Sequence, residues 1–365
     1  MLFISSSGIA HLIVVRSLAD TAHIICGELA MQKNRLGSSD LRISPIGLGT
    51  WAIAGTGWEY SWGAQDDEDS LGALEYAVER GVNWIDTAAV YGLGHAEQLV
   101  GQLLRRVPAS RRPLVFTKGS LVWDPVTKAI SHSLAPQSLL AEVDASLRRL
   151  QVETIDLYQI HWPAFPADGS SEGIESALSA LATAREQGKI RAIGVSNFDV
   201  AQLERARAVT EIVSLQPPYS ALMRDIEDAV LPFCEQAAMG VLAYSTLQSG
   251  LLSGSMTRER IAQLPDDDWR KARSADFQEP RLSANLALVE VLAGIGERHG
   301  VSAAAVAIAW VLRKPVVTGA IVGARRPAQV DGLVAGSQLR LSAEEIDEIQ
   351  PFLPSGMGTN VPGVA

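Results

Sequence analysis

The chain has 365 residues and a mass of 39.0 kDa, with 47% hydrophobic and 20% charged residues, so it is long enough to bury a large core. Its formal net charge of −10 disfavours a nucleic-acid partner, because phosphate binding needs clustered lysine and arginine. Two cysteines occur, Cys26 and Cys234, and neither has metal-ligand spacing around it. A disulfide framework and a metal site are therefore disfavoured, and we predict a cytoplasmic protein.

Residues 1–30 differ from the rest of the chain, because their apolar runs are short and broken. No lysine or arginine precedes the weak HLIVV run, as a signal peptide would require, and no run reaches the length of a membrane span. We predict that residues 1–30 are a disordered extension or reflect a misassigned start codon, with a degenerate export signal as the alternative. The folded domain is predicted to cover residues 31–365.

From residue 40 onward, short β-rich runs alternate with amphipathic helical stretches. The predicted strands cover 42–50, 83–88, 113–119, 154–161, 190–198, 212–219, 240–247 and 318–324. Predicted helices include 67–81, 95–106, 135–150, 174–188 and the buried-looking 303–314. Eight β/α repeats of about 30–40 residues predict a single closed (β/α)8 barrel. The alternative is an open doubly wound sheet, but its GxGxxG turn is replaced by GLGTW after the first strand.

In a barrel the chemistry lies where strands end, on one face. The predicted second strand ends in Asp86, with Tyr91 in the loop after it, while the third ends in Lys118 and the fourth in His161. Each residue alone has an ordinary interpretation as a turn cap, a packed ring or a solvated charge. A lysine at the close of the apolar run LVFT is different, because it would be partly desolvated and need an acid. Asp86 on the adjacent strand is the natural partner, and the joint pattern favours an active site.

These residues resemble the tetrad of the aldo-keto reductases, in chain order and in local context: IDTAxxYG, TKG and QIHWP. The resemblance continues with GVSNF at 194–198, QPPYS at 216–220, AYSTLQSGLLSG at 243–254 and GARRPAQV at 323–330. Together with an insertion at 266–282, it is closest to a bacterial branch that includes stress-protein-like reductases and polyol dehydrogenases. The resemblance implies a barrel with an N-terminal β-hairpin and additional C-terminal helices.

The resemblance also implies an NADP(H)-dependent oxidoreductase that interconverts small aldehydes or ketones and the matching alcohols or polyols. Tyr91 would be the general acid or base, Lys118 would lower the pKa of its phenol, and Asp86 would hold Lys118. His161 would orient and hydrogen-bond the carbonyl oxygen. For alcohol oxidation Tyr91 would act as the base.

Cofactor residues are implied at the later strand ends. Ser196 and Asn197 resemble the pair that grips the nicotinamide carboxamide, with Gln216 close by, and Tyr219 resembles the aromatic residue that stacks on the ring. The segment from Ser245 to Leu252 would wrap the pyrophosphate with backbone N–H groups. The implied contact residues after Tyr219 are Ser245, Leu247, Gly250 and Leu252, then Gly323, Ala324, Arg325 and Gln329.

Two arginines after the eighth strand favour NADP(H), with NAD(H) as the weaker alternative, because a guanidinium suits a 2′-phosphate. The chain departs from the family where an acid and an asparagine often contact adenine, since Gly332 and Leu333 stand there. Trp51 and Trp162 match substrate-pocket positions of the family. Loop placement alone adds Trp58, Trp62 and Trp123 as candidates, with ordinary packing as the alternative.

Two other functions compete with the oxidoreductase. A regulatory or scaffold subunit that retains a nucleotide would leave the intact tetrad with slow turnover. A barrel isomerase or aldolase using Lys118 as a Schiff base would leave the SNF and GARRPAQ segments without a role. The physiological substrate, the favoured direction and the oligomeric state do not follow from the sequence.

Overall fold

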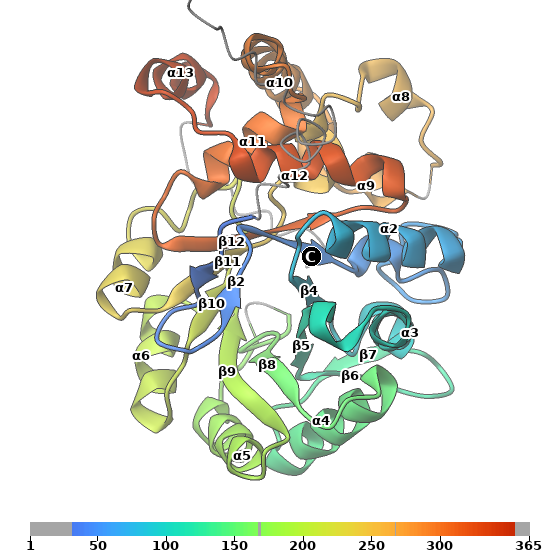
Figure 1. The fold of residues 1–365 in the computed structure, drawn as a ribbon, viewed down its shortest axis with the longest axis vertical. Coiled ribbons are helices and arrows are strands. Elements are labelled where there is room, and N and C mark those ends of the chain that lie inside the picture. Colours follow the sequence, from blue (N-terminus) through green and yellow to red (C-terminus); the bar gives the residue numbers. More distant parts are fainter. Residues whose placement is uncertain (1–30, 167–168, 267, 355–365) are drawn as a thin grey trace, which may run out of the picture. The chain divides into compact units, whose positions relative to one another are not determined.

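Eight parallel strands close into a barrel in the computed structural model, which describes residues 31–166, 169–266 and 268–354 (Figure 1). The strands are β3 Ile46–Gly49, β4 Trp84–Asp86, β5 Leu114–Gly119, β8 Ile155–Ile160, β9 Ile190–Ser196, β10 Ser214–Gln216, β11 Gly240–Ala243 and β12 Val317–Gly323. Neighbours in the barrel follow chain order, and the last strand closes on the first with Ala320 opposite Ile46. The predicted (β/α)8 barrel is confirmed. The prediction for residues 1–30 lies outside the described residues.

Helices surround the strands (Figure 1). They are α2 Asp67–Glu79, α3 His95–Arg106, α4 Pro136–Leu150, α5 Ile174–Glu186, α6 Val200–Val209, α7 Val230–Gln236, α8 Arg258–Ala262, α9 Trp269–Ala272, α10 Arg281–His299, α11 Ala303–Leu312, α12 Val330–Gln338 and α13 Ala343–Ile349. Short 3-10 turns are η1 Trp51–Ile53, η2 Tyr91–Gly94, η3 Ala109–Arg111, η4 Gln248–Ser253, η5 Ala275–Phe277, η6 Pro327–Gln329 and η7 Gln350–Phe352. The predicted helices all form, and α11 is buried as its all-apolar sequence indicates.

The first predicted strand, 42–50, is wrong as a single element. Its start forms β2 (Arg42–Ile43), which pairs antiparallel with β1 (Asn34–Arg35), and only 46–49 joins the barrel. Ser44 and Pro45 separate the two pieces, because proline has no N–H for a ladder bond. The β1–β2 pair is the N-terminal hairpin that the family resemblance implies.

The hairpin covers one end of the barrel interior. Leu36, Leu41 and Ile43 are fully buried in one apolar cluster with Trp84 of β4 and Phe116 of β5. The Trp84 ring also needs the glycine at position 47, since a Cβ there would lie 2.2 Å from the ring. This end of the barrel is therefore closed by apolar packing.

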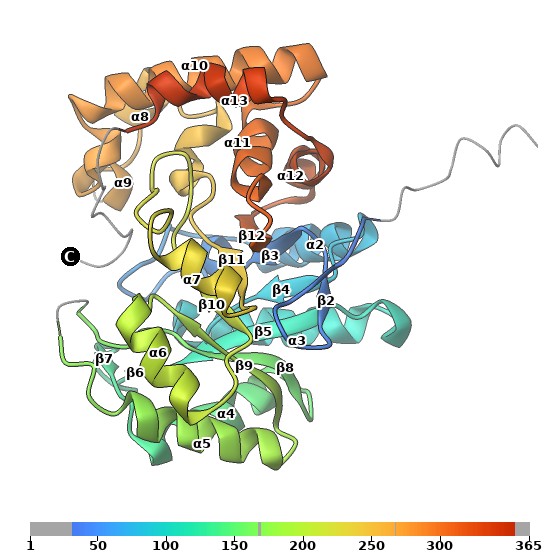
Figure 2. The ribbon, with the colours of Figure 1, turned by 90° about the vertical axis from the view of Figure 1, so that its left-hand side faces the viewer.

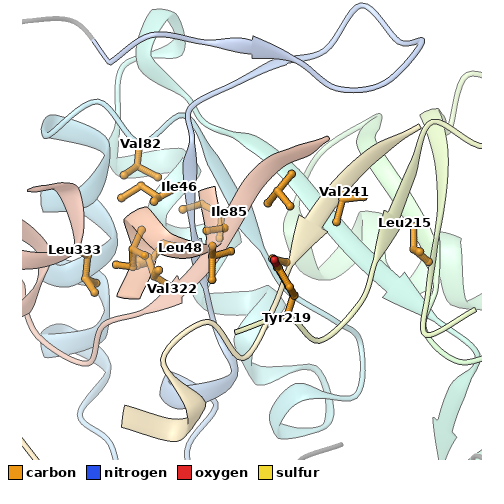
Figure 3. Close-up of a cluster of buried hydrophobic side chains, with 14 of the residues drawn as sticks. Ile46, Leu48, Val82, Ile85, Leu215, Tyr219, Val241, Val322 and Leu333 are labelled. Carbon is orange, nitrogen blue, oxygen red and sulfur yellow. The ribbon is translucent and has the colours of Figure 1, made fainter. Parts of the chain in front are cut away.

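A second apolar layer lies between the strands and the helices. Figure 3 shows Ile46, Leu48 and Val322 from the strands with Leu333 of α12 in this layer. Burying such side chains contributes about 1.5–3 kcal/mol each, so this layer supplies much of the stability. The polar residues of the barrel lie at the other end, where the strands finish.

Figure 2 shows β2 and the side hairpin β6 (Leu121–Trp123) and β7 (Ile130–His132) on opposite sides of the barrel.

Candidate active site

Three neighbouring strands bring Asp86, Lys118 and His161 to the same end of the barrel. Asp86 is the last residue of β4, Lys118 is the fifth residue of β5, and His161 follows β8 directly. Their exposed fractions are 3%, 1% and 6%. The parallel pairing of β4 with β5 and of β5 with β8 places the three strand ends side by side, as the sequence predicts.

The buried ion pair of the site joins Lys118 to Asp86. Lys118 Nζ lies 2.6 Å from Asp86 Oδ1 and also donates to the carbonyl oxygen of Thr87 at 3.0 Å. The other carboxylate oxygen, Oδ2, accepts from Gln216 Nε2 at 2.8 Å. Burial lowers the pKa of Lys118 and Asp86 raises it, so the carboxylate offsets part of the cost of burying the ammonium. The Lys118 side chain is fully buried, and its Nζ donates to both Asp86 and the Thr87 carbonyl oxygen. This arrangement does not suit a lysine that attacks a substrate carbonyl to form a Schiff base.

Tyr91 lies over this pair at the start of the η2 turn. Its ring centroid is 5.3 Å from Lys118 Nζ and 5.7 Å from the His161 ring. The turn depends on Gly92, which has φ +59° and no room for a Cβ, since one would lie 2.2 Å from the carbonyl oxygen of Ala54. The sequence therefore directs the Tyr91 side chain back across the barrel end.

The expected lowering of the Tyr91 pKa by Lys118 is not what the structure gives. Burial raises the pKa of Tyr91 well above its usual value, and the Asp86 and Tyr244 side chains raise it further. The physical reason is that burial disfavours the charged phenolate and the Asp86 carboxylate repels it. Burial also lowers the pKa of His161 well below its usual value, with a further contribution from Lys118. The site thus holds a neutral phenol beside a neutral imidazole.

The predicted carboxamide-gripping residues are assembled beside the tetrad. Asn197 Nδ2 donates to the His161 carbonyl oxygen at 2.9 Å, and Ser196 Oγ donates to the Gln216 carbonyl oxygen at 2.7 Å. Asn197 adopts φ +63°, a left-handed conformation that asparagine tolerates. The Gln216 side chain points to Asp86 and to Gln159 Oε1, at 3.3 Å. Gln216 therefore belongs to the ion-pair network.

Tyr219 does not lie in the site, which corrects the assignment made from sequence. Its ring is fully buried and packs 5.6 Å from that of Trp310, and Figure 3 shows it within the hydrophobic cluster. The hydroxyl donates to Glu227 Oε1 at 2.5 Å and accepts from Arg313 at 2.9 Å. No face of this ring is free to stack on a nicotinamide.

Tyr244 is the aromatic residue that the sequence reasoning missed. It directly follows β11, is only half-buried, and its hydroxyl donates to Asn197 Oδ1 at 2.8 Å. The predicted strand 240–247 placed Tyr244 in its interior, whereas β11 ends at Ala243. With that shorter strand, the rule that functional side chains follow strand ends would have indicated Tyr244.

The predicted phosphate segment follows Tyr244. Ser245, Gln248, Ser249 and Gly250 all have positive φ, between 43° and 90°, so this loop is tightly curled. The N–H groups of Gly250 and Leu252 both donate to the carbonyl oxygen of Leu247, at 3.0 and 3.1 Å, and so are not available to a phosphate. The Leu252 side chain is fully buried. The prediction that the backbone N–H groups of Gly250 and Leu252 bind the pyrophosphate is therefore wrong.

The residues predicted to bind the adenosine phosphate lie close together after β12. The backbone N–H of Arg325 donates to Gln329 Oε1 at 2.8 Å, while its guanidinium donates to Gln65 Oε1 and to the carbonyl oxygen of Ala64, both at 2.6 Å. Burial lowers the pKa of Arg325, and the neighbouring Arg270 lowers it further. Gly323 is exposed and Ala324 is buried beside them. The Arg270 guanidinium is itself paired with Asp268 at 2.6 Å.

Aromatic rings pack around Tyr91. Trp51 lies 5.1 Å from the Tyr91 ring and 5.2 Å from that of Trp58, and Tyr60 extends the cluster at 5.9 Å from Trp58. Trp162 is buried next to His161, and its ring lies 6.2 Å from that of Phe165. Trp51, Trp58 and Trp162 thus share one cluster with Tyr91, whereas Trp62 and Trp123 stack on Arg270 and Arg149.

The fold and the tetrad define a (β/α)8-barrel oxidoreductase. A family model described as the aldo/keto reductase family matches residues 45–353, so the chain belongs to that family. Aldo-keto reductase YhdN of Bacillus subtilis is 35% identical over 88% of this chain and 94% of its own length. The NADH-specific methylglyoxal reductase of Escherichia coli is 32% identical, over 86% of this chain and 95% of its own.

Among solved structures, the chain is similar to the glycerol dehydrogenase AKR11B4 from Gluconobacter oxydans. The TM-score is 0.80 at 36% identity, covering 91% of this chain and 99% of that one. A holo form of AKR11C1 from Bacillus halodurans matches with a TM-score of 0.72 at 24% identity and supports the fold alone. In the described part of the chain no helix is both long and apolar enough to span a membrane.

Proposed function

We propose that the protein is an NADP(H)-dependent oxidoreductase that interconverts small aldehydes or ketones and the matching alcohols, including polyols. The observation that carries this proposal is the buried Lys118–Asp86 pair, which lies under Tyr91 with His161 beside it. Similarity to a methylglyoxal reductase and to a glycerol dehydrogenase supports small oxygenated substrates. The low cysteine content and the buried free thiol of Cys234 support a cytoplasmic location.

The arrangement suits carbonyl reduction because Tyr91 is kept protonated until negative charge develops on the substrate oxygen. A neutral phenol can donate a hydrogen bond to the carbonyl oxygen and pass its proton as that oxygen becomes an alkoxide. Lys118 then stabilises the phenolate that forms, while Asp86 holds the ammonium in place. The neutral imidazole of His161 offers a second N–H donor to the same oxygen.

The site also fits a nicotinamide cofactor, which when bound supplies the hydride for the carbonyl carbon. Tyr244 presents a half-buried ring at the strand end, and we propose it as the stacking residue in place of Tyr219. Ser196 and Asn197 stand next to it with polar groups for a carboxamide. Nδ1 of His161 is buried and has no hydrogen-bond partner among the described residues.

Replacing Tyr91 by Phe tests the role of the phenol. We expect kcat for aldehyde reduction to fall by about 10²–10⁴-fold, since general acid catalysis contributes that much. NADPH binding, followed by quenching of tryptophan fluorescence, should be retained. The matched control is Tyr60→Phe, which removes a phenol from the same aromatic cluster and should keep kcat within about threefold. Equal activity of the two variants would refute the assignment.

We propose that the cofactor preference rests on Arg325 in the loop after β12, because its guanidinium lies near that of Arg270 in α9. Arg325→Ala is expected to lower the NADPH-to-NADH ratio of kcat/KM by about tenfold, the equivalent of ~1.4 kcal/mol. Arg326→Ala, at the neighbouring exposed arginine, is the control and should change the ratio less. If Arg325→Ala leaves the NADPH-to-NADH ratio unchanged, Arg325 does not set the cofactor preference. A larger change in Arg326→Ala would assign that role to Arg326.

A panel of small aldehydes, ketones and polyols, assayed in both directions with both cofactors, tests the function as a whole. The absorbance of the reduced nicotinamide reports turnover. Tight NADPH binding without turnover of any substrate would contradict the enzyme proposal.

A further inference from the structure

The end of the barrel opposite the active site carries an unusual concentration of cationic side chains. Two adjoining hollows of about 500 and 260 Å³ lie where strands begin, beside the β1–β2 hairpin. Lys33 and Arg42 line both hollows, so the two hollows meet at these side chains. We call the two together the basic recess. Its lining includes Arg191, which is paired with Asp40 and Asp156, and six further cations: Lys33, Arg35, Arg42, Arg111, Arg112 and Lys314.

The six cations come from four separate segments of the chain. Lys33 and Arg35 come from the start of the hairpin and Arg42 from its second strand, while Arg111 and Arg112 precede β5. Lys314 lies between α11 and β12. The hairpin is anchored by buried apolar side chains, so these cations stand on a rigid base.

The six cations are not neutralised by the protein. In the described ranges none of the six has a carboxylate within 4.0 Å; the guanidinium of Arg35 donates to the carbonyl oxygens of Ser38 and Ser39. The lining contains one acid, Asp40, and that carboxylate is already 3.1 Å from Arg191. A carboxylate network therefore does not explain the cluster.

The concentration is notable because the chain as a whole is acidic. Acidic residues outnumber lysine and arginine by 41 to 31, so an even distribution would place acids in the majority here as well. Clustered cations repel one another, and the repulsion is relieved when an anion binds among them. Four of the six are arginines, whose planar guanidinium groups match phosphate oxygens with paired hydrogen bonds.

We propose that the basic recess binds a small anion that carries several phosphate groups. Its two joined compartments suit a compact ligand with separate phosphates. A long nucleic acid is disfavoured, because beyond the recess it would meet a protein of net charge −10. The shared chemistry, a chain of phosphates, is present both in inorganic polyphosphates and in nucleoside polyphosphates.

Isothermal titration of the full chain tests the proposal, with inorganic tripolyphosphate as the probe and NADPH at saturation. Saturating NADPH blocks the phosphate-binding groups of the active site. We expect one tripolyphosphate per chain, with AMP binding about tenfold or more weakly, because a single phosphate engages fewer cations. A second titration uses magnesium-free ATP. If ATP binds as tightly as tripolyphosphate, the recess recognises the phosphate chain alone. If ATP binds more tightly, the recess recognises a nucleoside polyphosphate.

The variant Arg42→Gln/Arg112→Gln removes two cations from the basic recess. We expect its tripolyphosphate affinity to fall by about tenfold or more at low ionic strength. The matched control is Arg80→Gln/Arg298→Gln, which changes the net charge equally at two exposed arginines paired with Asp331 and Glu348. Unchanged carbonyl reduction in both double variants verifies that they fold.

Three outcomes overturn the proposal. One is the absence of tripolyphosphate binding at low salt, and another is an equal loss of affinity in the two double variants. The third is tighter binding of a single-stranded oligonucleotide than of tripolyphosphate, which would assign the recess to nucleic acid instead.

Discussion

Strand β5 separates two buried ion pairs that are alike in geometry and different in role. Inside the barrel Lys118 meets Asp86 at 2.6 Å, and outside it Arg149 meets Glu97, also at 2.6 Å. Thr117, the residue before Lys118, donates to Glu97 at 2.6 Å, because successive residues of a strand point to opposite faces. The two pairs are thus separated by little more than the thickness of one strand.

The surroundings distinguish the two pairs. The inner pair lies where the strands end, next to Tyr91 and the aromatic cluster. The outer pair is enclosed between β5, α3 and α4, with a second acid, Glu142, nearby. A buried ion pair therefore does not by itself indicate catalysis. Its position at the open end of the barrel, beside a proton donor, does.

Lys118→Met should have the largest effect on turnover. Without the ammonium the Tyr91 phenolate loses its stabilising charge, and we expect kcat/KM to fall by about 10³-fold or more, equivalent to ~4 kcal/mol. Initial rates at saturating cofactor measure this. Arg149→Met removes the cation of the outer pair and should keep kcat/KM within about threefold below its unfolding temperature. Similar losses of kcat/KM in Lys118→Met and Arg149→Met would contradict the different roles of the two ion pairs.

Arg149→Met should instead destabilise the fold. It leaves Glu97 fully buried without its cation, and breaking such a pair costs about 3–5 kcal/mol, with the lower value expected because Arg149 is 19% exposed. Urea unfolding followed by circular dichroism measures the loss. Arg148→Met, at the adjacent exposed arginine, should change stability by less than about 0.5 kcal/mol. Adding Glu97→Gln to Arg149→Met should restore part of the loss; no recovery would contradict this account.

Glu142 should make the outer region sensitive to pH. Burial raises the pKa of Glu142 to about 7, while hydrogen bonds from the Ser120 N–H at 3.0 Å and the Ser138 hydroxyl at 3.1 Å oppose the shift. Because folding raises the pKa of this carboxyl group, the folded state favours its protonated form. The group therefore contributes its full stability at pH values below the pKa of the unfolded chain. That contribution is lost as the pH rises from about 4.5 towards 7.

Glu142→Gln removes this titration while retaining an acceptor for the Ser120 N–H. At pH 8 we expect the variant to be more stable than the wild type by at most ~3 kcal/mol, with a smaller difference at pH 5. Thermal unfolding at the two pH values measures it, with the exposed Glu153→Gln as control. A difference independent of pH would show that Glu142 stays ionised throughout.

The inner pair and the barrel could be predicted from sequence because their signals are local. Each strand is a short apolar run, and Asp86, Lys118 and His161 stand at the ends of such runs in chain order. The outer pair could not be found this way. Glu97 and Arg149 lie on different helices, 52 positions apart, and nothing near either residue indicates that they meet.

The sequence pointed to Tyr219 instead of Tyr244 for a similar reason, because the deciding contacts join residues from different parts of the chain. Tyr244 directly follows β11, whereas Tyr219 lies beyond the end of β10 and contacts Trp310, Arg313 and Glu227. Which way a side chain turns after a strand depends on such tertiary contacts. The motifs located the two strands, but the predicted strands 212–219 and 240–247 ran past the ends of β10 and β11, and the structure separates the two rings.

The closure of β12 on β3 sets an order of events during synthesis. Residues 46 and 320 pair with each other, roughly 270 positions apart. At about 5–20 residues per second, a ribosome needs roughly 15–55 s to deliver the last strand after the first. Throughout that interval one edge of β3 has no strand to pair with, and open edges are where chains join wrong partners. A nascent chain that stops before Val317 therefore leaves two exposed edges, on β3 and on β11, that only the missing strand can cover.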